Sequence, residues 1–165
     1  TIIGTEIGVA NGDNAKQILN FLNIKQLILV DPWKGYTDFW WEEDTSNSID
    51  ETLDDNLHES NYKETLKKFS NNSKVKIIRD YSTNAAKMFD NEYFDFVYID
   101  GNHSYEEVKK DLETWYPKLK KFGVMCGDDY GNIHVPVIKA VSEFAYKHKL
   151  LVQCDEKNQF WFVKV

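Results

Sequence analysis

A chain of 165 residues with 42% hydrophobic and 15% aromatic residues is long enough for one domain with a buried core, which excludes a disordered protein. No apolar run approaches the roughly 20 residues of a membrane-spanning helix, and residues 1–10 lack the basic region of a signal peptide. The sequence therefore predicts a single domain over residues 1–165, located in the cytoplasm and without a membrane partner.

The net charge of −7 is concentrated in one segment of the chain. Between Asp31 and Ser60 there are ten acidic residues and one lysine, a local charge of −9, which leaves +2 for the remainder. Binding to a phosphate backbone needs clustered lysine and arginine. The charge therefore argues against nucleic acid as a partner, whereas assembly into a homo-oligomer stays open.

The first half of the chain alternates between strand and helix patterns. The apolar run 2–9 predicts a strand, and apolar residues at helical spacing over 15–22 predict a helix. The run 27–30 predicts a buried strand. The strand is expected to end at Asp31-Pro32, because proline has no backbone N–H to donate to a neighbouring strand. The chain opens directly on its first strand without an initiating methionine, which favours a longer parent chain with a covering helix upstream.

The second half continues the same alternation. Strands are predicted at 75–78, 94–99, 124–126, 150–153 and 160–165. Helices are predicted over 62–69 and after Ser82, Ser104 and Pro136, with Ser104 and Glu107 in the pattern of a capping box. Only residues 155–159 separate the last two strands, too few for a parallel crossover, so one of these strands must run antiparallel to its neighbour.

This alternation predicts an α/β fold with helices on both faces of a doubly wound, mostly parallel sheet. In such sheets, ligands bind beyond the carboxyl ends of the strands. Turns are polar for structural reasons as well, but polar clusters follow five of the predicted strands here. They are 11–13, Asp31, 80–82, 100–103 and 127–129.

Glycines at Gly8 and Gly12 let the backbone approach a ligand where the first strand turns into a helix, although a tight turn is the alternative explanation. Three residues separate the two glycines, whereas the dinucleotide fingerprint has the pattern G-x-G-x-x-G. This spacing argues against an NAD-dependent oxidoreductase. Asp31 ends the second strand, 19 residues beyond Gly12, where a carboxylate can accept both hydroxyls of a ribose. Gly12 together with Asp31 therefore predicts a nucleoside ligand.

Four motifs make the sequence recognisable: Glu6 to Gly12, Asp31-Pro32-Trp33, Phe94 to Tyr105, and Gly123 to Tyr130. Together they resemble class I S-adenosylmethionine-dependent methyltransferases. The resemblance is strongest to the small-molecule O-methyltransferase branch with an Asp-Gly-x-His-x-Tyr signature, which is related to macrolide-sugar and catechol O-methyltransferases. It spans nearly the whole chain, and it implies a seven-stranded sheet with one antiparallel strand near its end, in agreement with the final strand pair.

The resemblance implies S-adenosylmethionine as the cofactor. By position in the motifs, Glu6, Gly8 and Gly12 line the methionine and ribose portion, and Asp31 accepts the ribose hydroxyls. Tyr81 and Ser82 lie beside the adenine. The implied cofactor-binding set is Glu6, Gly8, Asn11, Gly12, Asp31, Tyr81, Ser82 and Asp100.

Metal-dependent relatives have an aspartate at the end of the fourth strand and an acidic or amide pair at the end of the fifth. Asp100, Asp128 and Asp129 match these positions. Three carboxylates that converge at one edge suit Mg²⁺ or Ca²⁺, both of which prefer oxygen ligands. The alternative is that Asp128 and Asp129 only cap the next segment.

His103 lies three residues after Asp100, where catechol-type relatives have a lysine and macrolide-sugar relatives a histidine base. An imidazole can remove a proton from a hydroxyl that a metal ion polarises, so His103 and Asp100 are the predicted catalytic residues. The alternatives for His103 are a helix cap or a cofactor contact. The other histidines, His58, His134 and His148, are predicted to be solvated.

The acidic segment 33–60 is the least regular part of the chain. Its aromatic residues are Trp33, Tyr36, Phe39, Trp40 and Trp41. Because aromatic side chains are costly in a free loop, a lid that shapes the acceptor pocket is favoured over a plain surface loop.

The predicted function is methyl transfer to a hydroxyl of a small polar acceptor such as a sugar, assisted by a divalent metal. The alternative from another class is a non-catalytic subunit that binds a ligand or a protein on the same fold.

Overall fold

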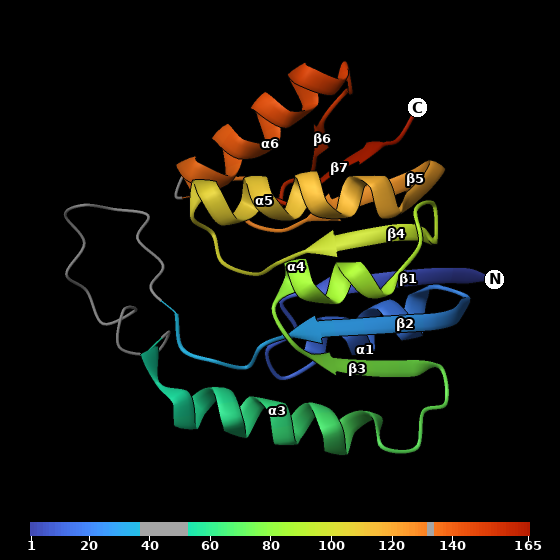
Figure 1. The fold of residues 1–165 in the computed structure, drawn as a ribbon, viewed down its shortest axis with the longest axis vertical. Helices are drawn as coiled ribbons and strands as arrows, with labels where there is room; N and C mark the ends of the chain where they lie inside the picture. The colour runs from blue at the N-terminus through green and yellow to red at the C-terminus, as the bar shows by residue number, and fades with distance from the viewer. Residues whose placement is uncertain (37–52, 132–133) are drawn as a thin grey trace.

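The computed structural model describes residues 1–36, 53–131 and 134–165. Within these ranges, seven strands form one sheet in the order β3-β2-β1-β4-β5-β7-β6 (Figure 1). The strands are β1 (Ile2–Ile7), β2 (Ile24–Asp31), β3 (Val75–Arg79), β4 (Phe94–Ile99), β5 (Leu119–Gly127), β6 (Gln153–Cys154) and β7 (Phe160–Val163). Strands β1 to β5 pair in parallel, which confirms the predicted mostly parallel α/β sheet.

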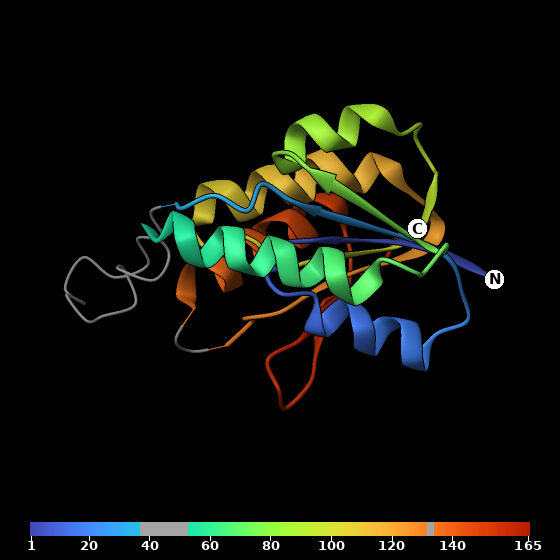
Figure 2. The same cartoon turned by 90° about the horizontal axis from the view of Figure 1, so that it is seen from below.

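Helices lie on both faces of the sheet (Figure 2). They are α1 (Asp13–Phe21), α3 (Asp55–Phe69), α4 (Ser82–Ala85), α5 (Tyr105–Trp115) and α6 (Val135–His148), with short 3-10 turns at Ala86–Met88 and Tyr116–Lys118. Helices α1 and α3 contribute to one hydrophobic core, and α4, α5 and α6 to the other. In the described ranges, no helix is long and apolar enough to span a membrane.

Strand β2 shows why this sheet needs helices on both faces. Ile28 and Val30 belong to one core, whereas Leu27 and Leu29 belong to the other, and none of the four is more than 1% exposed. Because successive side chains of a strand point to opposite faces, a strand buried on both faces is apolar throughout. Each such side chain stabilises the fold by about 1.5–3 kcal/mol relative to an exposed position.

The antiparallel strand of the predicted final pair is β7. It runs antiparallel to both of its neighbours, β5 and β6, so it lies between two strands that precede it in the chain. Asp155 closes the turn between β6 and β7, because its Oδ1 accepts hydrogen bonds from the backbone N–H groups of Lys157 and Gln159 at 2.9 and 3.0 Å.

Two local predictions need correction. Ser104 is the N-cap of α5, but its side chain makes no capping hydrogen bond and Glu107 pairs with Lys110 instead, so the capping box does not form. The irregular segment also ends earlier than predicted: α3 begins at Asp55, because the Asp54 side chain accepts a hydrogen bond from the backbone N–H of Asn56. Of the predicted lid 33–60, residues 37–52, with Phe39, Trp40 and Trp41, lie outside the described residues.

Candidate active site

The five polar clusters lie at the carboxyl ends of β1 to β5, where the arrowheads of β2 and β4 point in Figure 1. Backbone hydrogen bonds join the first residue after a strand to the end of the neighbouring strand. Gly8 N donates to Val30 O at 2.9 Å, and Asp100 N donates to Ile7 O at 2.8 Å. The loops after β1, β2 and β4 therefore form one continuous edge.

Both glycines of the first motif have positive φ angles, +83° at Gly8 and +80° at Gly12. A Cβ at Gly8 would lie 1.9 Å from the carbonyl oxygen of Asp100, and one at Gly12 would lie 2.8 Å from the Phe69 ring. These positions thus need glycine because the loop after β1 touches the loop after β4 and helix α3. Their contact with a cofactor stays a prediction.

Trp33, the first residue of the predicted lid, anchors the glycine loop. It is only 1% exposed, and its Nε1 donates a hydrogen bond to Ala10 O at 2.7 Å. From α3, Thr65 Oγ1 donates to the same oxygen at 3.0 Å, and Lys68 Nζ donates to Asn11 O at 2.7 Å. This described part of the segment therefore belongs to the core beneath the loop.

Asp31 connects the end of β2 to the glycine loop. Its Oδ2 accepts hydrogen bonds from the backbone N–H groups of Val9 and Ala10 at 2.8 and 3.1 Å, and Oδ1 accepts one from Trp33 N at 2.6 Å. A carboxylate has about four acceptor positions, so Asp31 shapes the loop and keeps acceptor capacity for a further donor.

Glu6 is buried at the carboxyl end of β1, with 1% of its surface exposed. Asn14 Nδ2 donates a hydrogen bond to its Oε1 at 3.0 Å, whereas Oε2 has no partner. Burial raises the pKa of Glu6 to about 8, and the charges of Asp100 and Asp31 add to this, whereas the Asn14 hydrogen bond opposes it. A buried carboxyl oxygen without a partner needs an explanation, and a bound polar group or cation would supply one.

Ser82 and Tyr81 have different surroundings at the end of β3. Ser82 Oγ donates a hydrogen bond to Asp111 and accepts one from Trp115 Nε1 at 2.7 Å, whereas Tyr81 is 56% exposed. Burial raises the pKa of Asp111 to about 7, although the Ser82 hydrogen bond lowers it. Asp111 is not among the predicted site residues, although the sequence carries a signal for its burial, because it shares one helical face with the apolar residues Val108, Leu112 and Trp115.

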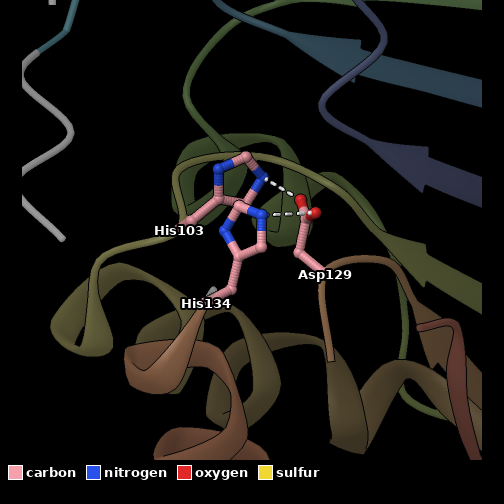
Figure 3. A group of neighbouring side chains, drawn as sticks. All are labelled: His103, Asp129 and His134. Carbon is pink, nitrogen blue, oxygen red and sulfur yellow. Dashed lines mark ion pairs between the residues drawn. The ribbon is translucent and has the colours of Figure 1, made fainter. Parts of the chain in front are cut away.

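The most distinctive group at this edge consists of two histidines on one carboxylate (Figure 3). His103 Nε2 lies 2.8 Å from Asp129 Oδ2, and His134 Nε2 lies 2.9 Å from Asp129 Oδ1. The two imidazole rings meet edge to face with centroids 5.3 Å apart. Asp129 itself has a positive φ of 63°, in the turn that follows β5.

The prediction that His134 is solvated is wrong: the residue is only 6% exposed. It directly precedes α6, so the loop from β5 to α6 places it at the same edge as His103. The pattern of strand and helix could have indicated this, since α6 follows the carboxyl end of β5.

Charges of both signs meet around Asp129. Burial alone would raise its pKa, but the hydrogen bond from His103 and the charges of His103 and His134 outweigh burial and keep this pKa below its ordinary value. The pKa of Asp128 is raised, mainly by burial and further by the charges of Asp100 and Asp129, against the hydrogen bond from its neighbour's backbone N–H.

The two predicted catalytic residues also lie together. Asp100 Oδ1 is 3.7 Å from His103 Nε2, and both residues line a small cavity with Asp128 and Val137. The structure thus brings Asp100, His103, Asp128 and Asp129 to one place, and it adds His134.

A family model and a curated relative both match this chain. A model described as a methyltransferase domain matches residues 5–130. The relative is an uncharacterized protein, R132, of Acanthamoeba polyphaga mimivirus, 28% identical over 125 residues. The match covers 76% of this chain and 50% of the relative, so the chain spans about half the length of that protein.

Solved structures share the fold at low sequence identity. The O-methyltransferase NovP is 17% identical with a TM-score of 0.68, over 100% of this chain and 72% of that one. The precorrin-6y C5,15-methyltransferase of Geobacter metallireducens is 12% identical with a TM-score of 0.65, over 98% and 78%. Spermidine synthase of Thermotoga maritima is 12% identical with a TM-score of 0.63, over 99% and 54%. Since the family model covers most of the chain, the protein belongs to the methyltransferase-domain family.

Proposed function

We propose that the protein transfers a methyl group from S-adenosylmethionine to a hydroxyl of a small polar acceptor, with sugars as the first class to test. The names of the structural neighbours cover an O-methyltransferase, a precorrin methyltransferase and spermidine synthase, so the fold does not select the acceptor. The observation that carries the choice of a hydroxyl is the His103–Asp129 pair, at 2.8 Å, at the edge that holds the predicted cofactor-binding residues.

The acidic residues of this edge fit the charge of the cofactor. When bound, S-adenosylmethionine supplies an electrophilic methyl group on a positively charged sulfonium centre. Asp31 and Asp100 provide negative charge at the ends of β2 and β4. Glu6, whose raised pKa favours the neutral form, adds a carboxyl group at the end of β1, with Oε2 unpartnered. In the proposal, these three residues hold the cofactor together with Gly8, Asn11, Gly12, Tyr81 and Ser82.

His103 is the proposed general base, and Asp129 is the residue that positions it. When Nε2–H donates to Asp129, the ring's lone pair lies on Nδ1, so Nδ1 is the atom that would accept the proton of the acceptor hydroxyl. The carboxylate of Asp129 also stabilises the imidazolium that forms, as the aspartate of a catalytic triad does. Asp100, 3.7 Å from the same ring, adds negative charge on that side.

A divalent cation at Asp100, Asp128 and Asp129 remains a prediction. Burial is the main cause of the raised pKa of Asp128, and the charges of Asp100 and Asp129 add to it; a cation would offset this part. Both oxygens of Asp129 already contact imidazoles, so an ion on all three carboxylates would use a remaining lone pair of Asp129 or displace one imidazole. The proposed proton transfer to His103 does not depend on this ion.

Cofactor binding tests the proposal most directly. Calorimetry should show that the wild-type chain binds S-adenosylmethionine and that Asp31→Ala weakens binding by roughly 1.5–3 kcal/mol, because it removes a charged acceptor at the edge. Asp95→Ala is the matched control: Asp95 also accepts a backbone N–H, from Ile3 at 2.7 Å, but lies at the start of β4, at the opposite edge. Unchanged affinity in Asp31→Ala would remove the ribose assignment, and absence of binding to the wild type would overturn the proposed function.

The metal prediction has its own measurement. With an acceptor found by screening for release of S-adenosylhomocysteine, chelation should lower turnover, and added Mg²⁺ should restore it. Turnover that survives exhaustive chelation unchanged contradicts a catalytic metal, while leaving the roles of His103 and Asp129 intact.

A further inference from the structure

We propose that His103, Asp129 and His134 form a binding site for a divalent transition-metal ion such as Zn²⁺, and that its occupation blocks the general base. The metal site itself rests on the geometry alone. Its inhibitory effect rests on the proposed function, because it depends on His103 as the base.

The three side chains lie together, with one imidazole against each oxygen of Asp129 (Figure 3). One ring nitrogen from each histidine and one carboxylate oxygen can be chosen so that all lie within 4.8 Å of one another. In a tetrahedral zinc site with bonds of about 2.0–2.1 Å, ligand atoms lie roughly 3.3–3.4 Å apart. The nitrogen–oxygen distances of 2.8 and 2.9 Å, which involve different oxygens of Asp129, would lengthen by a few tenths of an ångström to admit an ion. Any wider separation within the group, at most 4.8 Å, would have to shorten.

The donor set favours a transition metal over the hard cations that the sequence suggests. Imidazole nitrogens suit zinc and its neighbours in the first transition row, whereas Mg²⁺ and Ca²⁺ take oxygen ligands almost exclusively. Asp129 is the only member shared with the predicted three-carboxylate site. The two sites thus differ in two ligands out of three, and the difference in chemistry makes them separable by experiment.

The site is accessible to an ion and is supported from the protein side. The side chains of His103 and Asp129 are 21% and 25% exposed, whereas that of His134 is only 8% exposed. His134 is also held at its backbone, where its N–H donates to Gly131 O at 2.8 Å just before α6. Asp100, 3.7 Å from His103 Nε2, supplies further negative charge beside the ion.

Binding of an ion would remove the base by changing the protonation of His103. A metal ion on Nε2 displaces the proton there, and a neutral imidazole then carries its remaining proton on Nδ1. Nδ1 is the atom that would accept the hydroxyl proton, so it loses its lone pair. Asp129, drawn to the ion, no longer accepts a hydrogen bond from His103.

Zinc binding to the metal-free protein tests the site, with calorimetry for Zn²⁺ and visible absorption for Co²⁺ as a spectroscopic substitute. The wild-type chain should bind one ion, and His134→Gln should bind it more than about 100-fold more weakly, because loss of even a ligand's outer partner costs 10–100-fold. His148→Gln is the matched control, since it removes an imidazole from the other end of α6 and should bind like the wild type. Equal affinity in all three proteins would overturn the site.

Asp129→Asn is a second variant that guards against a folding artefact. It keeps the shape of the side chain and should also weaken Zn²⁺ binding.

In assays with saturating Mg²⁺, Zn²⁺ should inhibit the wild type and the His148→Gln control, each relative to its own zinc-free rate. A chelator that prefers Zn²⁺ to Mg²⁺ should reverse the inhibition. Full turnover with Zn²⁺ bound at this site would overturn the link to the base. The binding measurement decides the metal site even if no acceptor is found, so failure of the two proposals can be told apart.

Discussion

His103→Ala should lower turnover by about 10²–10⁴ while leaving the affinity for S-adenosylmethionine nearly unchanged, because removal of a general base affects proton transfer and not cofactor binding. The basis is the 2.8 Å contact of the imidazole with Asp129 at the carboxyl edge of the sheet. Steady-state kinetics on the acceptor and calorimetry on the cofactor together measure the two effects separately.

His103→Gln separates proton transfer from hydrogen bonding. An amide can replace a hydrogen bond but cannot take a proton, so this variant should be as slow as His103→Ala. The ascending limb of the wild-type pH–rate profile should be absent in both variants. If both variants lose cofactor affinity but turn over normally at saturation, His103 is a binding residue and the base lies elsewhere.

Gly8→Ala should destabilise the protein by about 3 kcal/mol or more, since it combines a positive φ with a backbone clash. The added Cβ would lie 1.9 Å from the carbonyl oxygen of Asp100, and φ at this position is +83°. The loop that carries Asp100 and His103 would have to move away from β1. Denaturant unfolding measures the loss, and cofactor affinity should fall with it.

Gly101→Ala is the control from the facing loop. The nearest atom to its added Cβ would be Asp111 Oδ2 at 3.8 Å, an ordinary contact, so this variant should unfold within about 0.5 kcal/mol of the wild type. A Gly8→Ala protein as stable as Gly101→Ala would show that the two loops are not in rigid contact.

The architecture could be predicted because the central strands leave little ambiguity in the sequence. A strand such as β2, buried on both faces, has an unbroken apolar run and a proline after its end, and both features are visible locally. The antiparallel strand could also be predicted, because the length of the 155–159 link limits its geometry. The common location of the polar clusters could then be predicted as well, since parallel strands bring their carboxyl ends to one edge.

What could not be predicted depends on contacts that the pattern of residues does not select. Ser104 and Glu107 match a capping box, but the Glu107 carboxylate forms an ion pair with Lys110, three residues later on the same helix. This ion pair competes with the capping hydrogen bond. Trp33 has the composition of a lid residue, yet its contact with Ala10 O is visible only once β1 and β2 are paired. The order of strand and helix indicates the edge at which His134 lies, but it does not show that His134 shares Asp129 with His103 from another loop.

The position of β7 has a consequence for how the chain folds during synthesis. Because β7 lies between β5 and β6 although it follows both, the edge of β5 stays open on the ribosome until residue 163 has emerged. An unpaired edge of this kind is a template for pairing with other chains. Nascent chains arrested before β7 are therefore the species that we expect to need a chaperone, whereas the five parallel strands can assemble earlier.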